Sequence, residues 1–310
     1  MKSPALLLPL LLLTPSLLAS TTTIPLRLIT YNIRYATTSP STGEQPWAVR
    51  RPLMASQLTL ETANRPESLI CMQEVLVQQL DNLQSDLGSA WTHIGVGRDD
   101  GAAAGEFSPL WYQPAVWAVQ ANRTYWLSPT PDVVGSKGWD AALPRIVTVA
   151  RLKHRATGAG LVAMCTHFDH VGQTAREESA KLLLKAAGEW GGDGSGTTTT
   201  PVVLGGDLNV QPDNKAYLTL VGGDGTAAGA MKDIKNLVPS AKWYGNNKTF
   251  TGFTAAKTDD TRIDYLFVRD PLASLKFLSY GVLSNVFDDG VYISDHRPVV
   301  VDAVLATGKA

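Results

Sequence analysis

The chain has 310 residues, 44% of them hydrophobic, which is enough for one large domain or two small ones with a buried core. Its 27 basic and 28 acidic residues nearly cancel, so the molecule has no global field that would attract polyanions. This balance weighs against tight, non-specific binding of nucleic acids, which rests on many phosphate contacts, although a local basic cleft is compatible with it.

The first residues have the pattern of a secretion signal. A short positive start precedes an almost pure leucine run at 5–13, and the small residues Ala19 and Ser20 follow. The run is too short to span a bilayer comfortably, and no later stretch is apolar enough for a second membrane segment. We predict a cleaved signal peptide at 1–20, rather than an uncleaved anchor. The secreted chain, 21–310, is expected to be a monomer with a single domain and no membrane attachment.

Two sequons and two cysteines are relevant to the expected secretion of the chain. The sequons begin at Asn122 and Asn247 and are typical of a secreted glycoprotein, although such short motifs are common by chance. Cys71 and Cys165 both lie in apolar, strand-like runs, and two cysteines cannot make a disulfide scaffold. We favour buried free thiols over a single bridge between neighbouring strands.

Apolar periodicity and turn residues predict the elements of the mature chain. In chain order these are a strand at 26–31, a helix at 46–64, a strand at 68–72, a helix at 77–87, strands at 91–96, 109–113, 116–126, 145–152 and 160–165, a helix at 174–190, a central strand from 202, and strands at 249–253, 263–268, 275–283 and 298–305. We place 109–113 and 116–126 in a second sheet. Thr174 is the expected cap of the third helix, and loops are expected at 191–200 and from the central strand to 247. Many strands with few helices between them predict one α/β domain of two packed sheets with helices outside.

The central strand runs straight into polar side chains. Pro201 opens it, apolar residues continue it, and two glycines precede Asp207 and Asn209. These two residues are two apart, so on an extended chain they point the same way. A carboxylate and a carboxamide at a strand end are suited to holding water and phosphate, although an Asp/Asn turn after a strand explains the pair equally well.

The same pattern recurs at other strand ends, and the repetition favours a functional site. Each such residue alone has an ordinary interpretation, as a turn residue, a solvated acid or a core histidine. Coincidence at so many strands is hard to produce by turn chemistry alone. The polar residues that end or precede predicted strands are Asn32, Glu74, His167, Asp169, His170, Asp207, Asn209, Asp264, Asp295 and His296.

The chemistry these side chains suit is metal-assisted attack of water on phosphorus. Glu74 offers a hard oxygen to a hard cation, and Asn32 can add a carbonyl oxygen, a combination that favours Mg²⁺. No Cys/His cluster has the spacing of a zinc site. A magnesium ion held there would neutralise charge on a phosphoryl oxygen and steady the leaving group.

The remaining residues fit roles around the reacting phosphate. Asp207 can hold and polarise the attacking water, and because an ordinary aspartate is a weak base, orientation is expected to matter more than proton removal. Asp264 paired with His296 would fix the imidazole and favour its charged form beside a phosphate. His167 and Asn209 can donate hydrogen bonds to the extra negative charge of the transition state.

These motifs resemble, in order and over nearly the whole mature chain, the endonuclease/exonuclease/phosphatase superfamily, which includes pancreatic-type DNases, deadenylases and sphingomyelinases. The matching motifs are Thr30-Tyr31-Asn32-Ile33, Met72-Gln73-Glu74, Thr166-His167, Gly206-Asp207-Leu208-Asn209, Ile263-Asp264-Tyr265 and Ser294-Asp295-His296. The resemblance implies a four-layered α/β sandwich, two packed mixed β-sheets flanked by helices, with the site at one edge of the sheets. It also implies Mg²⁺ or Mn²⁺ bound at Asn32, Glu74 and Asp295.

The resemblance implies roles for individual residues as well. Asp207 would handle the nucleophile, and His296 would lie at the scissile phosphate, oriented by Asp264. Stretches at 32–35, 138–145 and 167–172 look like a microbial secreted branch that carries no defined substrate.

Within those stretches, some residues are candidates for binding the substrate phosphate. Arg145 and His170 are the first of these, with structural roles as the equal alternative. Arg34 and Arg176 are weaker candidates.

We expect a secreted, Mg²⁺-dependent phosphoesterase that hydrolyses a P–O bond by in-line attack of water, with no covalent intermediate. Fold alone does not decide between diesterases and monoesterases. A nuclease, including a deadenylase-like 3′–5′ exoribonuclease, is one alternative. The near-neutral charge and the lack of an evident basic stripe with stacking aromatics weigh against it. A phosphatase or diesterase acting on small or glycan-linked phosphates is another.

Rivals from other classes are a non-catalytic phosphate-binding module and a structural glycoprotein. The complete set of acids and histidines argues against the first, and the second predicts no metal dependence. Four aromatic residues could line a sugar- or base-binding rim, although core positions suit most of them better: Trp111, Tyr112, Trp126 and Trp139.

Overall fold

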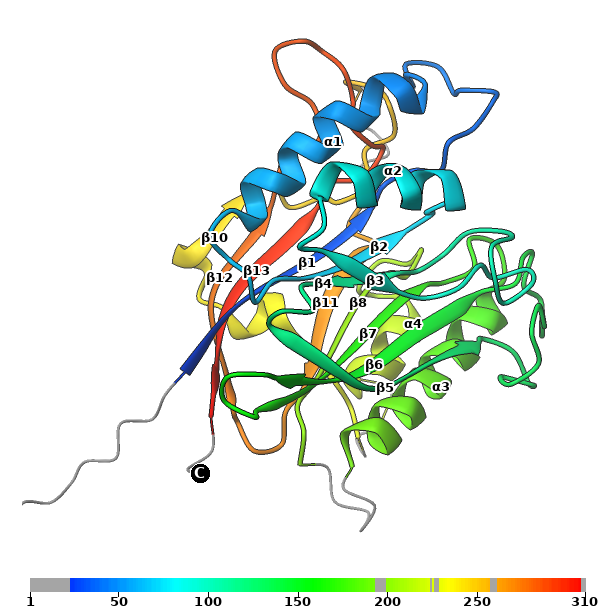
Figure 1. The fold of residues 1–310 in the computed structure, drawn as a ribbon. Helices are drawn as coiled ribbons and strands as arrows, with labels where there is room; N and C mark the ends of the chain where they lie inside the picture. The colour runs from blue at the N-terminus through cyan, green and yellow to red at the C-terminus, as the bar shows by residue number, and fades with distance from the viewer. Residues whose placement is uncertain (1–22, 193–198, 224, 226–228, 257–260, 308–310) are drawn as a thin grey trace, which may run out of the picture.

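The computed structural model describes residues 23–192, 199–223, 225, 229–256 and 261–307, so the predicted signal peptide lies outside the described residues. The described chain forms four layers, in the order helix, sheet, sheet, helix (Figure 1). One sheet has seven strands and the other six, and each combines parallel and antiparallel neighbours. The predicted four-layered α/β sandwich is therefore confirmed.

The N-terminal strand lies at the centre of the seven-stranded sheet. It pairs in parallel with β2 and antiparallel with β13. In spatial order the strands are β10 (Trp243–Gly245), β12 (Leu275–Val282), β13 (Val299–Ala306), β1 (Thr23–Asn32), β2 (Leu69–Gln73), β4 (Leu110–Tyr112) and β3 (Thr92–Ile94).

The six-stranded sheet is built around the strand that ends in Asp207. This strand, β8, runs parallel to β7 and antiparallel to β11. In spatial order the strands are β5 (Trp117–Trp126), β6 (Ile146–His154), β7 (Gly160–His167), β8 (Val202–Asp207), β11 (Asp264–Arg269) and β9 (Lys232–Asp233).

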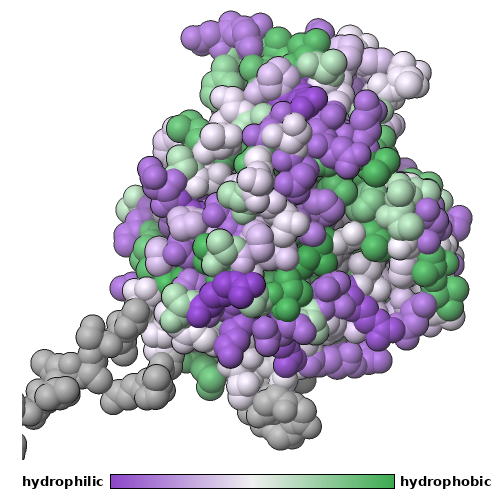
Figure 2. All heavy atoms as spheres, viewed as in Figure 1, coloured by the Kyte–Doolittle hydropathy of each residue, from purple (hydrophilic) through white to green (hydrophobic). Residues whose placement is uncertain are grey.

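Helices cover the outer face of each sheet (Figure 1). The seven-stranded sheet carries α1 (Trp47–Thr62) and α2 (Val77–Leu87), and the six-stranded sheet carries α3 (Gln173–Gly191) and α4 (Lys215–Val221). Two 3₁₀ helices, Ile234–Leu237 and Ser240–Lys242, complete the elements. Among the described residues, no helix combines the length and apolarity needed to cross a bilayer. On the face viewed in Figure 2, hydrophilic residues are interspersed with smaller hydrophobic areas.

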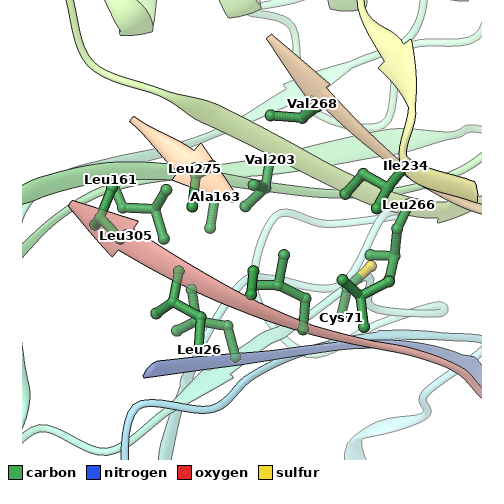
Figure 3. Close-up of a cluster of buried hydrophobic side chains, with 14 of the residues drawn as sticks. Leu26, Cys71, Leu161, Ala163, Val203, Ile234, Leu266, Val268, Leu275 and Leu305 are labelled. Carbon is green, nitrogen blue, oxygen red and sulfur yellow. The ribbon is translucent and has the colours of Figure 1, made fainter. Parts of the chain in front are cut away.

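Both faces of each sheet are buried because side chains alternate along the strands. In β1, Leu28 faces the other sheet and Ile29 faces the helices; in β8, Val203 faces the other sheet and Leu204 faces the helices. Side chains from both sheets interdigitate in the central layer, including Leu26, Leu161, Val203 and Leu305 (Figure 3). This packing holds the two sheets, and therefore their ends, in fixed relative positions.

Cys71 and Cys165 form a disulfide, so the prediction of two free thiols is wrong. Cys71 lies in β2 and Cys165 in β7, so the bridge joins the two sheets across the central layer. Each cysteine sits in an apolar strand, but only the packing of the sheets brings their Cα atoms to 5.2 Å. A Cβ on Gly205 of β8 would lie 2.9 Å from the Cβ of Cys71, so this close approach requires glycine.

Residues 109–113 were predicted to join the second sheet. In the structure they join the first. Ile70 and Cys71 of β2 pair antiparallel with Trp111 and Leu110 of β4. The apolar run predicted the strand correctly, but strand pairing is a long-range choice that a local pattern does not encode.

The predicted strand at 249–253 is also wrong. Phe250 makes only isolated bridges, to Thr261 and to His296. Gly252 has a φ of +61°, which interrupts an extended chain, and the Thr249 hydroxyl accepts backbone N–H bonds that a neighbouring strand would otherwise use.

The stretch after β8, predicted as loops, contains α4, β9, both 3₁₀ helices and β10. The α4 signals were present in the sequence: the Asn214 side chain accepts the Ala216 N–H, and Gly222 adopts the left-handed C-cap. Thr174 does not cap α3 as expected. Instead, the carboxylate of Asp140, which lies far away in the sequence, accepts the N–H groups of Thr174 and Ala175 at 3.1 and 2.7 Å.

Candidate active site

The polar residues at the strand ends lie along one edge of the two sheets. Asn32 and Glu74 lie at the carboxyl ends of the parallel strands β1 and β2, and antiparallel β13 begins at the same edge. In the other sheet His167 and Asp207 are register partners at the ends of parallel β7 and β8. Asp264 begins β11 directly opposite Asp207. The topology therefore brings together residues far apart in the sequence.

Three residues at this edge have left-handed backbones although none is glycine. The φ angles of Arg34, Glu74 and Asn209 are 58°, 61° and 52°. Such conformations are uncommon and cost free energy, and they concentrate where a side chain must be aimed. Each of these residues follows the end of a strand and turns its side chain back to the site.

His296 is held between two carboxylates. Its Nδ1 atom lies 2.9 Å from Asp264 Oδ2, and its Nε2 atom lies 3.7 Å from Asp207 Oδ2. Burial alone would lower the pKa of His296, but the charges of Asp264 and Asp207 outweigh it and raise the pKa well above the usual value. His296 is therefore an imidazolium that donates Nδ1–H to Asp264 and presents Nε2–H to the cleft.

The carboxylate of Asp207 is buried beside these charges. Burial and the charge of Asp264 raise the pKa of Asp207 to about 7, against the opposing charge of His296. The Asn209 backbone N–H donates to one Asp207 oxygen at 2.9 Å, and the Asn32 amide donates to the other at 3.0 Å. A carboxylate with a pKa near neutrality can accept a proton as well as orient water.

His167 is neutral and has a defined tautomer. Burial lowers the pKa of His167 well below its usual value, and the positive charges of Arg145 and Arg98 lower it further. Asn209 Nδ2, which can only donate, lies 3.0 Å from His167 Nε2, so the ring proton is on Nδ1. Asn209 also donates to the carbonyl of Phe168, so one of its amide hydrogens orients His167 and the other holds the Asn209 side chain in place.

The predicted metal residues Glu74 and Asp295 fit a hard divalent cation. Burial, and then the charge of Glu74, raise the pKa of Asp295, so a cation bound between the two acids would relieve their repulsion. Asn32 fits less directly. Its amide nitrogen donates to Glu74 at 2.9 Å, while its oxygen accepts the Arg34 N–H at 3.0 Å. In this arrangement Asn32 positions the carboxylates, and its oxygen, which accepts the Arg34 N–H, has a second lone pair that can face a cation.

Asp207, Asp264 and His296 also present one ligand atom each within 4.8 Å of one another. The His296 and Asp264 atoms already form a hydrogen bond. We therefore interpret this group as a hydrogen-bonded pair beside Asp207, and the carboxylates of Glu74 and Asp295 as the better match to an oxygen-seeking ion.

The predicted phosphate contacts Arg145 and His170 line the same cleft as His167 and Asp207. Arg145 Nη2 donates to His170 Nδ1 at 3.1 Å, and Arg145 Nε lies 3.6 Å from Asp169. Asp169 accepts backbone N–H groups from both loops that carry these residues, and these bonds offset its burial and lower its pKa to about 2. Asp169 thus fixes the wall that holds Arg145.

A cleft of about 1220 Å³ joins these groups. Arg34 and Arg176 line it, but both are engaged, Arg34 with Glu44 at 3.1 Å and Arg176 with the Asp169 carbonyl at 2.9 Å. In the described part of the chain its aromatic lining is Tyr35 and Phe250. None of the four aromatic residues considered for a binding rim lines this cleft: Trp111, Tyr112, Trp126 and Trp139. Trp111 and Trp126 are buried.

Two residues of the cleft wall, Arg98 and Glu106, are not among the candidates predicted from the sequence. They belong to the glycine-rich loop between β3 and β4, where no strand end marks them. Glu106 is half-buried against Arg98 Nη1 at 2.6 Å, and burial and the charge of Glu74 raise its pKa. In the sequence, the one local feature that could have indicated their role is that an arginine and an acid flank a glycine-rich loop.

Comparison with known proteins agrees with this geometry. The model of the endonuclease/exonuclease/phosphatase family matches residues 29–296. No curated protein matches the chain.

Solved structures resemble the chain over nearly its full length. A family member from Bacteroides vulgatus is 34% identical, with a TM-score of 0.78 over 92% of this chain and 100% of that one. One from Bacteroides thetaiotaomicron is 32% identical, with a TM-score of 0.79 over 93% and 100%. A mannosyl-6-phosphatase from the same species is 32% identical, with a TM-score of 0.77 over 90% and 99%. The chain therefore belongs to the endonuclease/exonuclease/phosphatase family.

Proposed function

We propose that the protein is a secreted, Mg²⁺-dependent phosphoesterase that hydrolyses a phosphate-ester bond by in-line attack of water. One observation carries the proposal: the Nε2 atoms of His167 and His296 lie 3.5 and 3.7 Å from the same oxygen of Asp207. A buried carboxylate flanked by a neutral and a charged imidazole is suited to a water molecule on one side and a phosphate on the other.

Each residue then has a chemical task. Asp207 orients the attacking water and accepts its proton. His296, positively charged and held by Asp264, donates to a phosphate oxygen as negative charge develops there. Glu74 and Asp295 would hold the divalent cation, which when bound neutralises charge on the phosphoryl group and the leaving oxygen.

The test is hydrolysis of a chromogenic phosphodiester and the matching monoester by the mature protein, with Mg²⁺ and with chelator. Asp207→Ala is expected to lower kcat/KM by about 10²- to 10⁴-fold on whichever ester is cleaved, because the group that handles water is lost. The exposed acid Asp132 gives a matched control, since Asp132→Ala removes a carboxylate that does not line the cleft. Equal rates for wild type and Asp207→Ala would contradict the proposal.

Small or glycan-linked phosphates are the proposed substrates. Similarity to a mannosyl-6-phosphatase over nearly the whole chain supports this choice. A nuclease, including a deadenylase-like exoribonuclease, remains the alternative, and a panel of RNA, single- and double-stranded DNA, inositol phosphates and sugar phosphates distinguishes the two. Phosphate binding without turnover of any of them would indicate a non-catalytic module.

Secretion of a glycosylated monomer is part of the proposal. It rests on the signal-like first residues and on the sequons, whose asparagines Asn122 and Asn247 are both exposed. N-terminal sequencing of the exported protein tests the cleavage, and a shift in mass on deglycosylation tests the sugars.

A further inference from the structure

Arg50, on α1, is a buried cation that does not line the cleft and has no part in the proposed mechanism. Its side chain is 1% exposed, and the Glu44 carboxylate lies 3.9 Å from Nη2, too far for a hydrogen bond. The five N–H groups of its guanidinium instead meet backbone carbonyls at 2.9 to 3.5 Å. These carbonyls belong to Ile33, Arg34, Tyr35, Gln45 and Ile293. Because burying a charge costs free energy, this arrangement indicates a role other than filling space.

Arg50 connects two of the loops that carry the predicted metal residues. Its Nη1 atom donates to the carbonyl of Ile33, one residue after Asn32, at 2.9 Å. The same nitrogen donates to the carbonyl of Ile293, two residues before Asp295, also at 2.9 Å. The hydrogen-bonded ladder between β1 and β13 ends before either loop begins. Beyond the end of that ladder, one guanidinium nitrogen therefore bridges the loop after β1 and the loop before β13.

Gln79, on α2, makes the corresponding connection to the loop after β2. This side chain is fully buried, and its amide nitrogen donates to the carbonyl of Arg34 at 3.0 Å. Its oxygen accepts the N–H groups of Ala36 at 2.9 Å and of Leu76 at 3.2 Å. Leu76 follows Glu74 by two residues, so one carboxamide bridges the loops after β1 and β2. Both α1 and α2 lie on the outer face of the seven-stranded sheet (Figure 1).

The loop after β1, which both side chains hold, is also the loop that aims the Glu74 carboxylate. The backbone N–H of Tyr35 donates to one Glu74 oxygen at 3.2 Å, and the Asn32 amide donates to the other at 2.9 Å. A displacement of this loop would move both donors and, with them, the carboxylate. Arg50 and Gln79 therefore act on Glu74 through the position of the loop.

We propose that Arg50 and Gln79 are positioning residues of the metal site, which fix the three loops that carry the predicted metal residues and so set the affinity for the divalent cation. The proposal rests on the proposed function, and it assigns control of metal affinity to two helix residues outside the cleft. Replacing a residue that orients metal ligands typically lowers metal affinity by about 10- to 100-fold. Lysine cannot replace Arg50, because it offers three donors on a flexible stem instead of five in a fixed fork.

The first test measures Mn²⁺ binding to the mature protein by electron paramagnetic resonance, which detects the free ion and requires no turnover. Arg50→Lys is expected to raise the Mn²⁺ dissociation constant by roughly 10- to 100-fold, because the loops on either side of the ion are no longer joined. Gln79→Met keeps the length of the side chain, removes its amide and should raise the constant by about tenfold. This second variant keeps the test decisive if Arg50→Lys does not fold.

Two other arginines provide matched controls. Arg27 is also buried, at 8% exposed, and pairs with Glu61 and with Asp302 on the part of β1 away from the cleft. Arg51 follows Arg50 on α1 and pairs with Asp86 at 2.7 Å, outside the cleft. Arg27→Lys is expected to lower the thermal stability and Arg51→Lys to leave it nearly unchanged. Neither should change the Mn²⁺ dissociation constant.

The second test separates metal affinity from the chemical step, on a chromogenic ester that wild type cleaves. In Arg50→Lys and Gln79→Met, the Mg²⁺ concentration that gives half the maximal rate should rise in parallel with the Mn²⁺ dissociation constant. At saturating Mg²⁺, kcat should fall by less than about threefold, because neither residue touches the reacting groups. A purely structural role predicts a loss of thermal stability with an unchanged metal dissociation constant.

The outcomes for the positioning residues and for the proposed function are distinct. If wild type binds no Mn²⁺ and chelator leaves its rate unchanged, the metal-dependent part of the proposed function fails. If wild type binds the ion but a folded Arg50→Lys or Gln79→Met variant binds it equally well, the positioning role is overturned and the phosphoesterase remains. An equal rise of the constant in Arg27→Lys would also overturn it, because loss of stability would then explain the effect. A rise confined to Arg50→Lys and Gln79→Met supports the proposal.

Discussion

Asp207 shows how neighbours change the chemistry of one side chain. An ordinary aspartate has a pKa near ~3.9 and would be a poor base. Here burial and Asp264 raise the pKa of Asp207 to about 7, while His296 limits the rise. From sequence alone, water orientation was the expected role of Asp207, and the buried setting now favours proton acceptance as well.

The Asp264–His296 pair gives a prediction for the pH dependence of the rate. In Asp264→Asn the charge that raises both the His296 and the Asp207 pKa is lost. His296 then loses its proton at lower pH, and Asp207 becomes an ionised base at lower pH. We expect both limbs of the kcat/KM profile to move to lower pH, by roughly one to three units on the alkaline side.

The measurement is a profile of kcat/KM against pH on the ester that wild type cleaves. Asp270, a polar residue at the end of β11 with no part in the site, provides a comparison, and Asp270→Asn should leave both limbs in place. A uniform fall in rate with unmoved limbs would show that Asp264 only fixes the position of the ring.

One carboxylate, that of Asp169, joins two loops into one wall of the cleft. Asp169 accepts N–H bonds from Ala142 and Leu143 of one loop and from Val171 and Gly172 of the other. Asp140 continues the connection by capping α3. This clamp is the reason that a segment without helix or strand can hold Arg145 in place.

Asp169→Asn is expected to destabilise the fold by about 2–4 kcal/mol at pH 7, because a charged acceptor of several N–H bonds becomes neutral and half donor. The Asp169 pKa is about 2 in the fold and about 3.9 when unfolded, so its stabilisation is present above pH ~4 and is lost as the pH falls toward 2. Urea unfolding at pH 7 and at low pH measures this. The difference between wild type and variant should shrink in acid, and a constant difference would contradict the assignment.

The disulfide and the central core both hold the two sheets together. Replacing Cys71 and Cys165 with serine opens a loop with a sequence separation of 94, which is expected to cost roughly 3–5 kcal/mol of unfolding free energy. Activity at 25 °C should persist, because the apolar layer still aligns the sheets. Denaturant unfolding and the rate on a chromogenic ester test the two parts separately. An unchanged unfolding free energy would mean that the bridge does not form.

Hydrogen bonds among the protein's own side chains hold the site, between Asn32 and Glu74 and between Asp264 and His296. Chelation is therefore expected to abolish hydrolysis while far-UV circular dichroism stays unchanged, and Mg²⁺ or Mn²⁺ should restore the rate. Activity that survives exhaustive chelation would contradict a metal-dependent mechanism, and unfolding on chelation would contradict a preformed site.

Alternation that buries both faces of the sheets predicted most of the strands, although not β9 and β10, and the polar residues that end them, from Asn32 to His296, were visible in the sequence. Those residues converge because parallel strands end at one edge of the sheets and antiparallel neighbours begin there. The order of the motifs along the chain already indicated this arrangement. Three features came from long-range packing instead: which sheet 110–112 joins, the contact of Cys71 with Cys165, and the presence of Arg98 and Glu106 in the cleft wall. Periodicity is local, written in neighbouring residues, whereas strand partners, cross-sheet contacts and loop placement depend on chain packing over long sequence separations.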